Sequence, residues 1–204
     1  MLRINNLSFA YDKDLIIEGF NLEVLEGEIV ALKGKSGSGK STILRLIANL
    51  EKAKTGEILI DGSKHVNINY KDRMIGYLFQ DYALFPHMTV QKNIEFGISH
   101  LSKGDQKALI KEYSKLLEIE NLLSRYPHEI SGGQKQRVAL ARTLVTKPKI
   151  LLLDEPMSAL DTDLKDVLRL FLRKVLKELN ITTIVVTHDK EDVEVICDRA
   201  ILID

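Results

Sequence analysis

The segment GKSGSGKST, residues 34–42, has the composition of a loop that binds phosphate. It fits the pattern G-x4-G-K-S, running from Gly34 to Ser41, and it lies between an apolar run and a helical stretch. Glycine lets backbone N–H groups turn toward an anion, and a helix start presents further unpaired N–H groups. The Lys40 ammonium can reach the β- and γ-phosphates of a nucleotide, and the Ser41 hydroxyl can coordinate Mg2+. The pattern therefore predicts a nucleotide-phosphate site.

Two acidic residues follow a second apolar run. In KILLLDEP, residues 149–156, Asp154 and Glu155 come at the end of a predicted buried strand. Open α/β sheets bind ligands at the carboxyl ends of their strands. Asp154 is predicted to hold the Mg2+ shell, and Glu155 to orient or deprotonate an attacking water. An acidic pair at a strand end is commonplace, so it is the phosphate loop that favours this catalytic interpretation.

The segment ISGGQ, residues 130–134, precedes an amphipathic helix. It gives the chain a second helix start with exposed N–H groups, which is a second potential anion site. Nothing obvious in the chain needs one, because the first loop already accounts for a nucleotide. The residues alone leave open whether Ser131, Gly132 and Gly133 only begin a helix or also bind an anion.

Apolar runs without alternation predict the strands that position these residues. Residues 29–32, 150–153 and 183–186 are typical of parallel strands buried on both faces. Residues 21–24 alternate between polar and apolar types, which is typical of a half-solvated antiparallel sheet. Further strands are predicted at residues 3–9, 57–60, 75–79 and 200–203.

Helices are predicted after most of the buried strands. One covers residues 40–48, directly after the glycine loop, and another covers residues 164–179. The second carries a stripe of apolar residues at helical spacing, expected to pack on the sheet: 164, 167, 168, 171, 175, 176 and 179. The middle of the chain, residues 82–144, is expected to be a helical insertion that carries the ISGGQ segment. The whole chain, 1–204, then forms one α/β domain with its core at 1–81 and 145–204.

Composition limits the classes of partner. The chain has 29 basic and 29 acidic residues, so its formal net charge is zero and gives no electrostatic case for nucleic acid. Cys197 is the single cysteine, expected to be buried and inert, and no internal disulfide can form. Neither a signal peptide nor a membrane span is predicted.

Taken together and in order, the motifs resemble those of the ATP-binding subunit of ABC transporters, over essentially the full chain. Residues 34–41 match the Walker A loop, Asp154 and Glu155 match Walker B and its catalytic glutamate, and residues 130–134 match the signature LSGGQ with Ile130 in place of leucine. The remaining matches are Gln80 for the Q-loop, residues 158–161 for the D-loop with Asp161 at its end, His188 for the switch histidine, and Tyr11 for the aromatic that stacks on adenine.

The resemblance implies a P-loop NTPase fold with a RecA-like parallel-sheet core, an N-terminal antiparallel β subdomain and an inserted helical subdomain. It implies catalysis by Glu155, His188 and Gln80, and Mg2+ binding by Ser41, Gln80 and Asp154. The residues expected to contact ATP are Tyr11, Gly34, Ser36, Gly37, Ser38, Gly39, Lys40, Ser41, Thr42, Ser131, Gly132, Gly133 and Gln134.

The resemblance also implies partners. Two copies are expected to pair head to tail, each ATP lying between the loop of one chain and the signature of the other. A membrane permease is expected to dock near Tyr82, Leu84 and Phe85, which would hold this chain at the cytoplasmic face of the membrane. The motifs look most like bacterial import ATPases serving molybdate, ferric iron, polyamines and sugars, which often carry a C-terminal regulatory domain; this chain ends at Asp204, so it is either naturally short or truncated.

Other functions remain open at this stage. A soluble ABC ATPase acting as a clamp in DNA repair or translation would share these motifs, as would an exporter ATPase. A small-molecule kinase with a phosphate loop would not need residues 130–134. The transported solute is not encoded in these motifs.

Overall fold

The computed structural model describes residues 1–12, 14–35, 37–64, 74–160 and 162–203, with the side chains of residues 162 and 163 left out. The strands are β1 (Leu2–Tyr11), β2 (Asp14–Val24), β3 (Ile29–Lys33), β4 (Thr55–Ile60), β5 (Ser63–Lys64), β6 (Ile75–Leu78), β7 (Ile150–Asp154), β8 (Thr182–Val186) and β9 (Arg199–Leu202). The helices are α1 (Lys40–Ile47), α2 (Val90–Phe96), α3 (Lys103–Leu116), α4 (Gly132–Leu144), α5 (Thr162–Glu178) and α6 (Lys190–Ile196), with short 3-10 turns η2 (Glu120–Leu122) and η3 (Pro127–Glu129).

The strands within these ranges form two sheets. A parallel sheet has the order β6-β7-β8-β3-β9, and an antiparallel sheet has the order β2-β1-β4-β5. The predicted buried runs became β3, β7 and β8, at the centre of the parallel sheet. The alternating residues 21–24 lie in β2, where Leu22 and Val24 are buried and their neighbours exposed. The predicted mixed α/β fold with an antiparallel N-terminal sheet is therefore confirmed.

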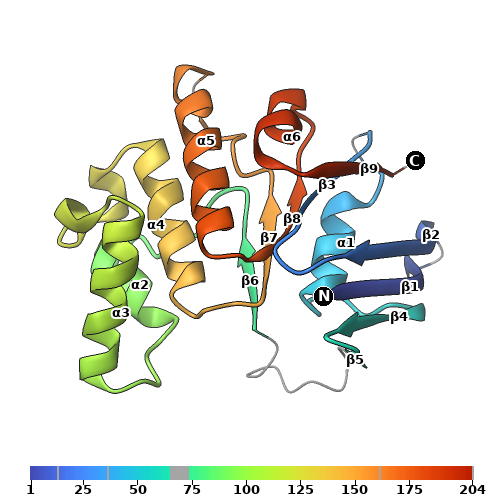
Figure 1. Ribbon diagram of the computed structural model, residues 1–204, viewed down its shortest axis with the longest axis horizontal. Helices are drawn as coiled ribbons and strands as arrows, with labels where there is room; N and C mark the ends of the chain where they lie inside the picture. Colours follow the sequence, from blue (N-terminus) through green and yellow to red (C-terminus); the bar gives the residue numbers. More distant parts are fainter. Residues whose placement is uncertain (13, 36, 65–73, 161, 204) are drawn as a thin grey trace.

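The parallel sheet separates two hydrophobic clusters. Along β3, Val30 and Leu32 pack with α1 and the antiparallel sheet, whereas Ile29 and Ala31 belong to the cluster formed with the helices. Successive strand residues point to opposite faces, so an apolar run without alternation is required when both faces are covered. Figure 1 shows the antiparallel sheet and α1 on one side of the parallel strands, and α2, α3 and α4 beyond β6.

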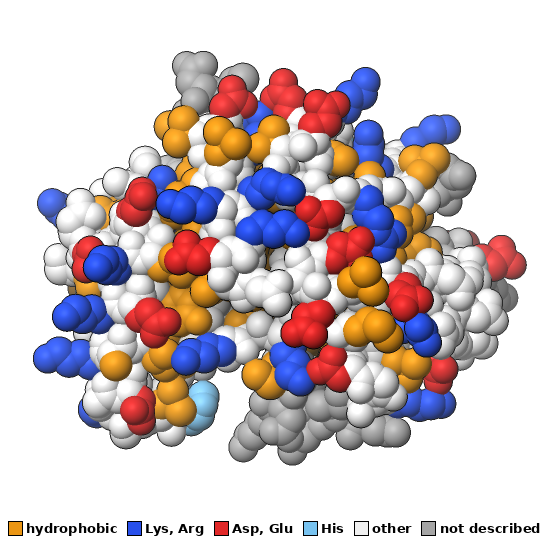
Figure 2. Space-filling view, in the orientation of Figure 1, with side chains coloured by type: hydrophobic (Ala, Val, Ile, Leu, Met, Phe, Trp, Pro, Cys, Tyr) orange, Lys and Arg blue, Asp and Glu red, His pale blue; other side chains and the backbone are white. Residues whose placement is uncertain are grey.

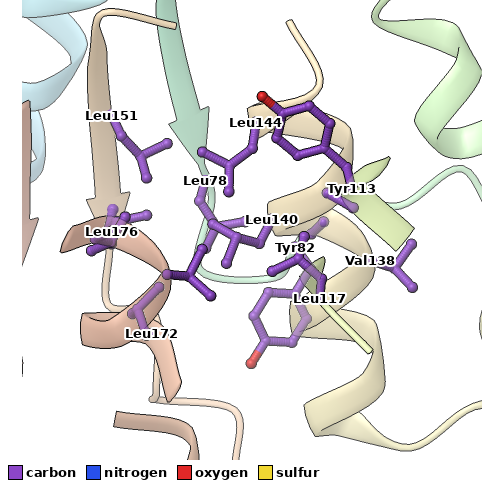
Figure 3. Packing of buried hydrophobic residues seen from close by; sticks show 14 of the residues in the cluster. Leu78, Tyr82, Tyr113, Leu117, Val138, Leu140, Leu144, Leu151, Leu172 and Leu176 are labelled. Carbon is purple, nitrogen blue, oxygen red and sulfur yellow. The ribbon is translucent and has the colours of Figure 1, made fainter. Parts of the chain in front are cut away.

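The region between β6 and β7 is helical and shares its core with the sheet. Leu140 and Leu144 of α4 are buried in the same cluster as Leu78 of β6 and Leu151 of β7 (Figure 3). This contact seats the C-terminal half of α4 against the parallel sheet. Each such leucine contributes about 1.5–3 kcal/mol by burial.

The stripe predicted on the helix after residue 161 is only partly correct. From Leu168 onward the stripe is buried or partly buried, but Leu164 and Val167 are 44% and 62% exposed. The first turns of α5 extend beyond the ends of the strands, so nothing in the sheet covers them (Figure 1). Cys197 is buried as expected, and burial raises the pKa of its thiol to about 12.

Candidate functional site

The phosphate loop joins β3 to α1, and its glycines are required by space and backbone conformation. A Cβ atom on Gly34 would lie 2.3 Å from the carbonyl oxygen of Ile203. Gly39, the N-cap residue of α1, has φ +85°, and no side chain caps the helix. The first N–H groups of α1 therefore remain free to bind an anion.

Lys40 is almost completely buried at this loop, with 8% of its surface exposed. Its Nζ atom donates to the carbonyl oxygens of Gly34, at 3.0 Å, and Lys35, at 2.6 Å, and lies 3.4 Å from the Ser38 hydroxyl. Each of these acceptors belongs to the loop itself. A phosphate bound on the loop could therefore take the place of these neutral oxygens and accept hydrogen bonds from the ammonium as a charged partner.

Asp154 ends β7 next to the loop and is buried, with both carboxylate oxygens hydrogen-bonded. The Ser41 hydroxyl donates to Oδ1 at 2.9 Å, and the Tyr77 hydroxyl donates to Oδ2 at 2.9 Å. Hydroxyl and carboxylate oxygens are the ligands that Mg2+ prefers. Among the described residues no group of three or more His, Cys, Asp or Glu could hold a metal, so Ser41 and Asp154 fit an ion that takes most of its ligands from phosphates and water.

Glu155 follows Asp154 with a left-handed backbone, φ +50°, which is uncommon for a non-glycine residue. Its N–H donates to the carbonyl oxygen of Val186 at 2.9 Å, so β8 holds the turn in place. Its Oε2 atom lies 2.7 Å from Nδ1 of His188, whose side chain is 73% exposed. Strained backbone of this kind is often found where a side chain must be aimed at a ligand.

The phosphate loop, Glu155 and His188 line one pocket of about 390 Å3. It brings together most of the predicted nucleotide-site residues with Ile16 and Val186: Tyr11, Gly34, Gly37, Gly39, Lys40, Ser41, Thr42, Glu155 and His188. Tyr11 is 42% exposed, meets the ring of Phe9 edge to face at 4.7 Å, and donates its hydroxyl to Glu51 at 3.2 Å. The pocket therefore combines a phosphate loop, an acid–histidine pair and an exposed aromatic ring.

Gln80 lies on the neighbouring surface. It is exposed and lines a second pocket of about 500 Å3, which it shares with Asp154 and Arg45. The structure thus places Gln80 on the same side as the carboxylate predicted to bind Mg2+, without a direct contact to the first pocket.

The start of α4 does not line either pocket. Ser131 is its N-cap: the hydroxyl accepts from the N–H of Gln134 at 3.4 Å, and the Gln134 side chain accepts from the N–H of Ser131 at 2.9 Å. Gly133 is buried, with a Cβ position 3.1 Å from Leu168 of α5. Within one chain, these residues therefore do not contribute to the phosphate loop pocket.

Tyr82, one of three residues near which a permease is expected to dock, does not offer an exposed side chain. Tyr82 is 4% exposed, its ring lies in the core between sheet and helices (Figure 3), and its hydroxyl reaches the carbonyl oxygen of Pro156 at 3.4 Å. Burial raises the pKa of Tyr82 to about 12. Leu84 and Phe85 are half-buried, and Phe85 packs on Phe96 at 4.7 Å. The apolar residues after Gln80 mainly serve the local core.

A much larger groove, about 1120 Å3, lies along β6. It runs between the end of α1, β6 and the start of α3, and its apolar lining includes Leu50, Met74, Phe79 and Leu109. Leu50 and Met74 are 58% and 41% exposed. This groove is the more open apolar surface near β6.

Two arginines that support the site were not predicted. Arg142 of α4 donates to the carbonyl oxygens of Tyr82, at 2.8 Å, and Ala83, at 2.7 Å, and so fixes the turn after Gln80. Arg169 of α5 is 1% exposed. It forms ion pairs with Asp166 on its own helix and with three carboxylates at the start of α6: Asp189, Glu191 and Asp192.

The Arg169 cluster is connected to His188. Asp189 directly follows His188, and its N–H donates to the hydroxyl of Thr187, which itself donates to Asp192 at 2.7 Å. Burial alone would lower the pKa of Arg169, but the hydrogen bond and charge of Asp192 raise it overall. A single arginine in an amphipathic helix carries no sequence signal of such burial. Ser36 and Asp161, two further predicted residues, lie outside the described residues.

Fold and phosphate loop together define a nucleotide-binding protein of the P-loop NTPase class. A sequence profile of the family described as "ABC transporter" matches residues 17–158, and the chain belongs to this family. The resemblance inferred from the motifs is thereby confirmed.

The relatives in sequence are named import proteins. The chain is 44% identical to the sulfate/thiosulfate import ATP-binding protein CysA of Synechocystis, over 98% of this chain and 57% of that protein. It is 42% identical to the probable sulfate/thiosulfate import ATP-binding protein CysA of Chlorella vulgaris, over 98% of this chain and 86% of that protein. The chain thus spans less than two thirds of the Synechocystis relative. These relatives are named for import, and not for DNA repair or export.

Solved structures share the fold. A dimeric post-hydrolysis state of the ATP-binding cassette MJ0796 bound to ADP and Pi is 33% identical, with a TM-score of 0.84, over all of this chain and 94% of that one. CbiO1 from Clostridium perfringens, part of the ABC transporter complex CbiONQ, is 32% identical, with a TM-score of 0.90, over all of this chain and 84% of that one.

Proposed function

We propose that this chain is the ATP-binding and ATP-hydrolysing subunit of an ABC import system. The observation that carries the proposal is the 390 Å3 pocket, where the phosphate loop faces Glu155 and His188. A phosphate-binding loop alone would serve many nucleotide-binding proteins. A carboxylate paired with an imidazole beside it supplies the acid–base chemistry that hydrolysis needs.

Binding would rest on groups that the chain already orients. The free N–H groups of α1 and the Lys40 ammonium would hold the β- and γ-phosphates. Ser41 and Asp154 would hold Mg2+, with Gln80 beside them; the ion would neutralise phosphate charge. The exposed Tyr11 ring would stack on adenine.

Hydrolysis would use Glu155 as the base. Its carboxylate would orient a water molecule and take one proton from it as the water attacks the γ-phosphate. His188, held next to Glu155 at 2.7 Å, would hold the γ-phosphate and position the carboxylate. The strained backbone of Glu155 suits this role, because it turns the side chain out of the strand toward the pocket.

A second copy of the chain would complete each site. Ser131, Gly132, Gly133 and Gln134 lie at the start of α4 and do not line the chain's own phosphate loop pocket. A head-to-tail pair would bring them to the γ-phosphate of the other copy. The dimeric ADP- and Pi-bound relative supports this arrangement. Hydrolysis would remove the shared phosphate contacts and release the dimer.

The permease would dock in the 1120 Å3 groove rather than at Tyr82. A short amphipathic helix of the permease suits an apolar groove lined by exposed Leu50 and Met74. Residues 82–144 would act as the helical subdomain that moves with it, with Leu84 and Phe85 packing its base. Across the described parts of the chain, no helix is long and apolar enough to cross a bilayer, so the permease would hold the chain at the inner face of the membrane.

The names of the relatives suggest the solute. We infer sulfate or thiosulfate as the first candidates, because relatives 41–44% identical are named for their import. The choice of solute is tested separately, by measuring the uptake of labelled sulfate in cells lacking this chain, with molybdate uptake as the comparison.

The substitution Glu155→Gln tests the hydrolytic function. It removes the base but keeps the shape of the side chain, so turnover in a phosphate-release assay should fall by about 100- to 10,000-fold. Mg-ATP binding should persist, and a dimer should accumulate, as measured by size-exclusion chromatography with light scattering. Glu129→Gln, in the turn that precedes α4, is the matched control and should keep normal turnover. Hydrolysis by the Glu155→Gln variant at the normal rate would contradict the assignment.

A further inference from the structure

Tyr77 touches both the carboxylate of Asp154 and the large groove. It lies on β6, which pairs in parallel with β7, and its position in the register faces Leu152, two residues before Asp154. Its hydroxyl donates to Oδ2 of Asp154 at 2.9 Å, while the Ser41 hydroxyl donates to Oδ1 at 2.9 Å. Both oxygens of the carboxylate are therefore held by one donor each.

The ring of Tyr77 faces the groove. It stacks on the ring of Phe79, with centroids 4.3 Å apart and planes inclined by 28°, and both rings line the 1120 Å3 groove. Phe79 is 39% exposed and directly precedes Gln80. One side chain thus connects the groove surface to the carboxylate beneath the phosphate loop.

The hydroxyl is not needed for packing. Phenylalanine at this position would keep the stacking and the groove lining, but would leave Oδ2 of the buried Asp154 without this donor. Losing a hydrogen bond to a buried charged group is costly and loosens its orientation.

We propose that Tyr77 is a positioning residue for the Ser41–Asp154 pair and that it transmits displacement of the groove surface to this carboxylate. The inference rests on the proposed function, in which Asp154 serves Mg2+ and the permease helix fills the groove. A displacement of the Phe79–Tyr77 stack would move the hydroxyl, and with it the carboxylate orientation. Occupancy of the groove would then alter how firmly the chain holds the metal–nucleotide pair.

Tyr77→Phe tests the hydroxyl alone. The affinity of the full chain for a fluorescent ATP analogue is measured in EDTA and in rising MgCl2. In EDTA, the affinity of the variant for the analogue should stay within about twofold of the wild-type value, because the loop is intact. The MgCl2 concentration that gives half of the magnesium-dependent change in affinity should rise about tenfold. Tyr113→Phe is the matched control, since Tyr113 is 5% exposed and lies on α3 away from Asp154; it should leave both values unchanged.

Phe79→Leu tests the connection to the groove. In the wild-type background, replacing the stacked ring should raise the half-saturating MgCl2 concentration about threefold. In the Tyr77→Phe background it should have no further effect, because the hydroxyl that connects the stack to Asp154 is already absent. Equal effects in both backgrounds would overturn the transmission, and an unchanged magnesium response of Tyr77→Phe would overturn the positioning role. Failure of the wild-type chain to bind nucleotide would instead overturn the proposed function.

Discussion

The phosphate loop and the start of α4 are both helix starts that expose backbone N–H groups, yet they are built differently. Around the loop, Lys40, Asp154 and Glu155 are each held by named hydrogen bonds from the same chain. At α4, Ser131 and Gln134 cap the helix start reciprocally, and both are partly or fully exposed. Figure 2 shows basic and acidic side chains interspersed over the visible face.

The phosphate loop therefore holds most of the groups that the proposed function needs, and the start of α4 holds few of them. Lys40 and the Glu155–His188 pair line the loop pocket, and the Ser41–Asp154 pair lies next to it. The start of α4 offers backbone donors and, at its fourth residue, Lys135, but no acid–histidine pair or metal-binding pair. We therefore expect an anion to bind there mainly when it is already held by something else. This is the arrangement expected if the two halves of a site come from two copies of the chain.

The largest effect is expected from Arg169→Met, which removes the buried ion pairs that support the start of α6 and His188 beside the phosphate loop. Methionine would fill the volume but leave Asp192, with a side chain 2% exposed, without its cation. Breaking a buried ion pair costs about 3–5 kcal/mol, which urea unfolding followed by circular dichroism would measure.

Arg3→Met is the control for this change. The ion pair of Arg3 with Glu23 is 44% and 51% exposed, so its loss should cost under about 1 kcal/mol. Arg169→Lys should recover part of the lost stability. If Arg169→Met were as mild as Arg3→Met, the buried cluster would not be the support that holds the α6 start and His188.

A smaller effect is expected from Lys40→Ala, which removes the cation from the loop. ATP affinity should fall about 10- to 100-fold, equivalent to one hydrogen bond between charged groups. Isothermal titration calorimetry would measure it at fixed MgCl2. Lys35→Ala, an exposed lysine of the same loop, should change affinity by no more than about twofold. Equal losses from both variants would show that general positive charge, and not the position of Lys40, is what binds phosphate.

The smallest effect on the isolated chain is expected from Ser131→Ala. Ser131 and Ser102 are both N-caps that accept a hydrogen bond from the N–H three residues on, at 3.4 and 3.2 Å. Either serine replaced by alanine should cost about 1 kcal/mol of stability. Only Ser131→Ala should also weaken the ATP-dependent dimer, by about tenfold in the Glu155→Gln background, as measured by analytical ultracentrifugation. Equal dimer affinities for the two variants would mean that Ser131 serves its helix alone.

Local patterns predicted much of the fold and the pocket. Apolar runs without alternation gave β3, β7 and β8, because strands covered on both faces need apolar residues at every position. The glycine loop and the residues that end β7 were also readable, because glycine spacing and strand ends depend on backbone conformation. The pocket then brought Glu155, His188 and Tyr11 to the loop as the motifs implied.

The partners of particular side chains were decided by the tertiary structure. Tyr77 reaches Asp154 because β6 lies beside β7, and Arg169 is buried because α6 packs its acidic start on α5. Tyr82 is buried, and Leu164 and Val167 are exposed, because the ends of the strands determine which turns find a covering surface. The sequence by itself determined which backbone conformations form and where phosphate can bind; only the folded arrangement decided which side chains meet, because contacts between distant residues depend on the order of strands and helices in space.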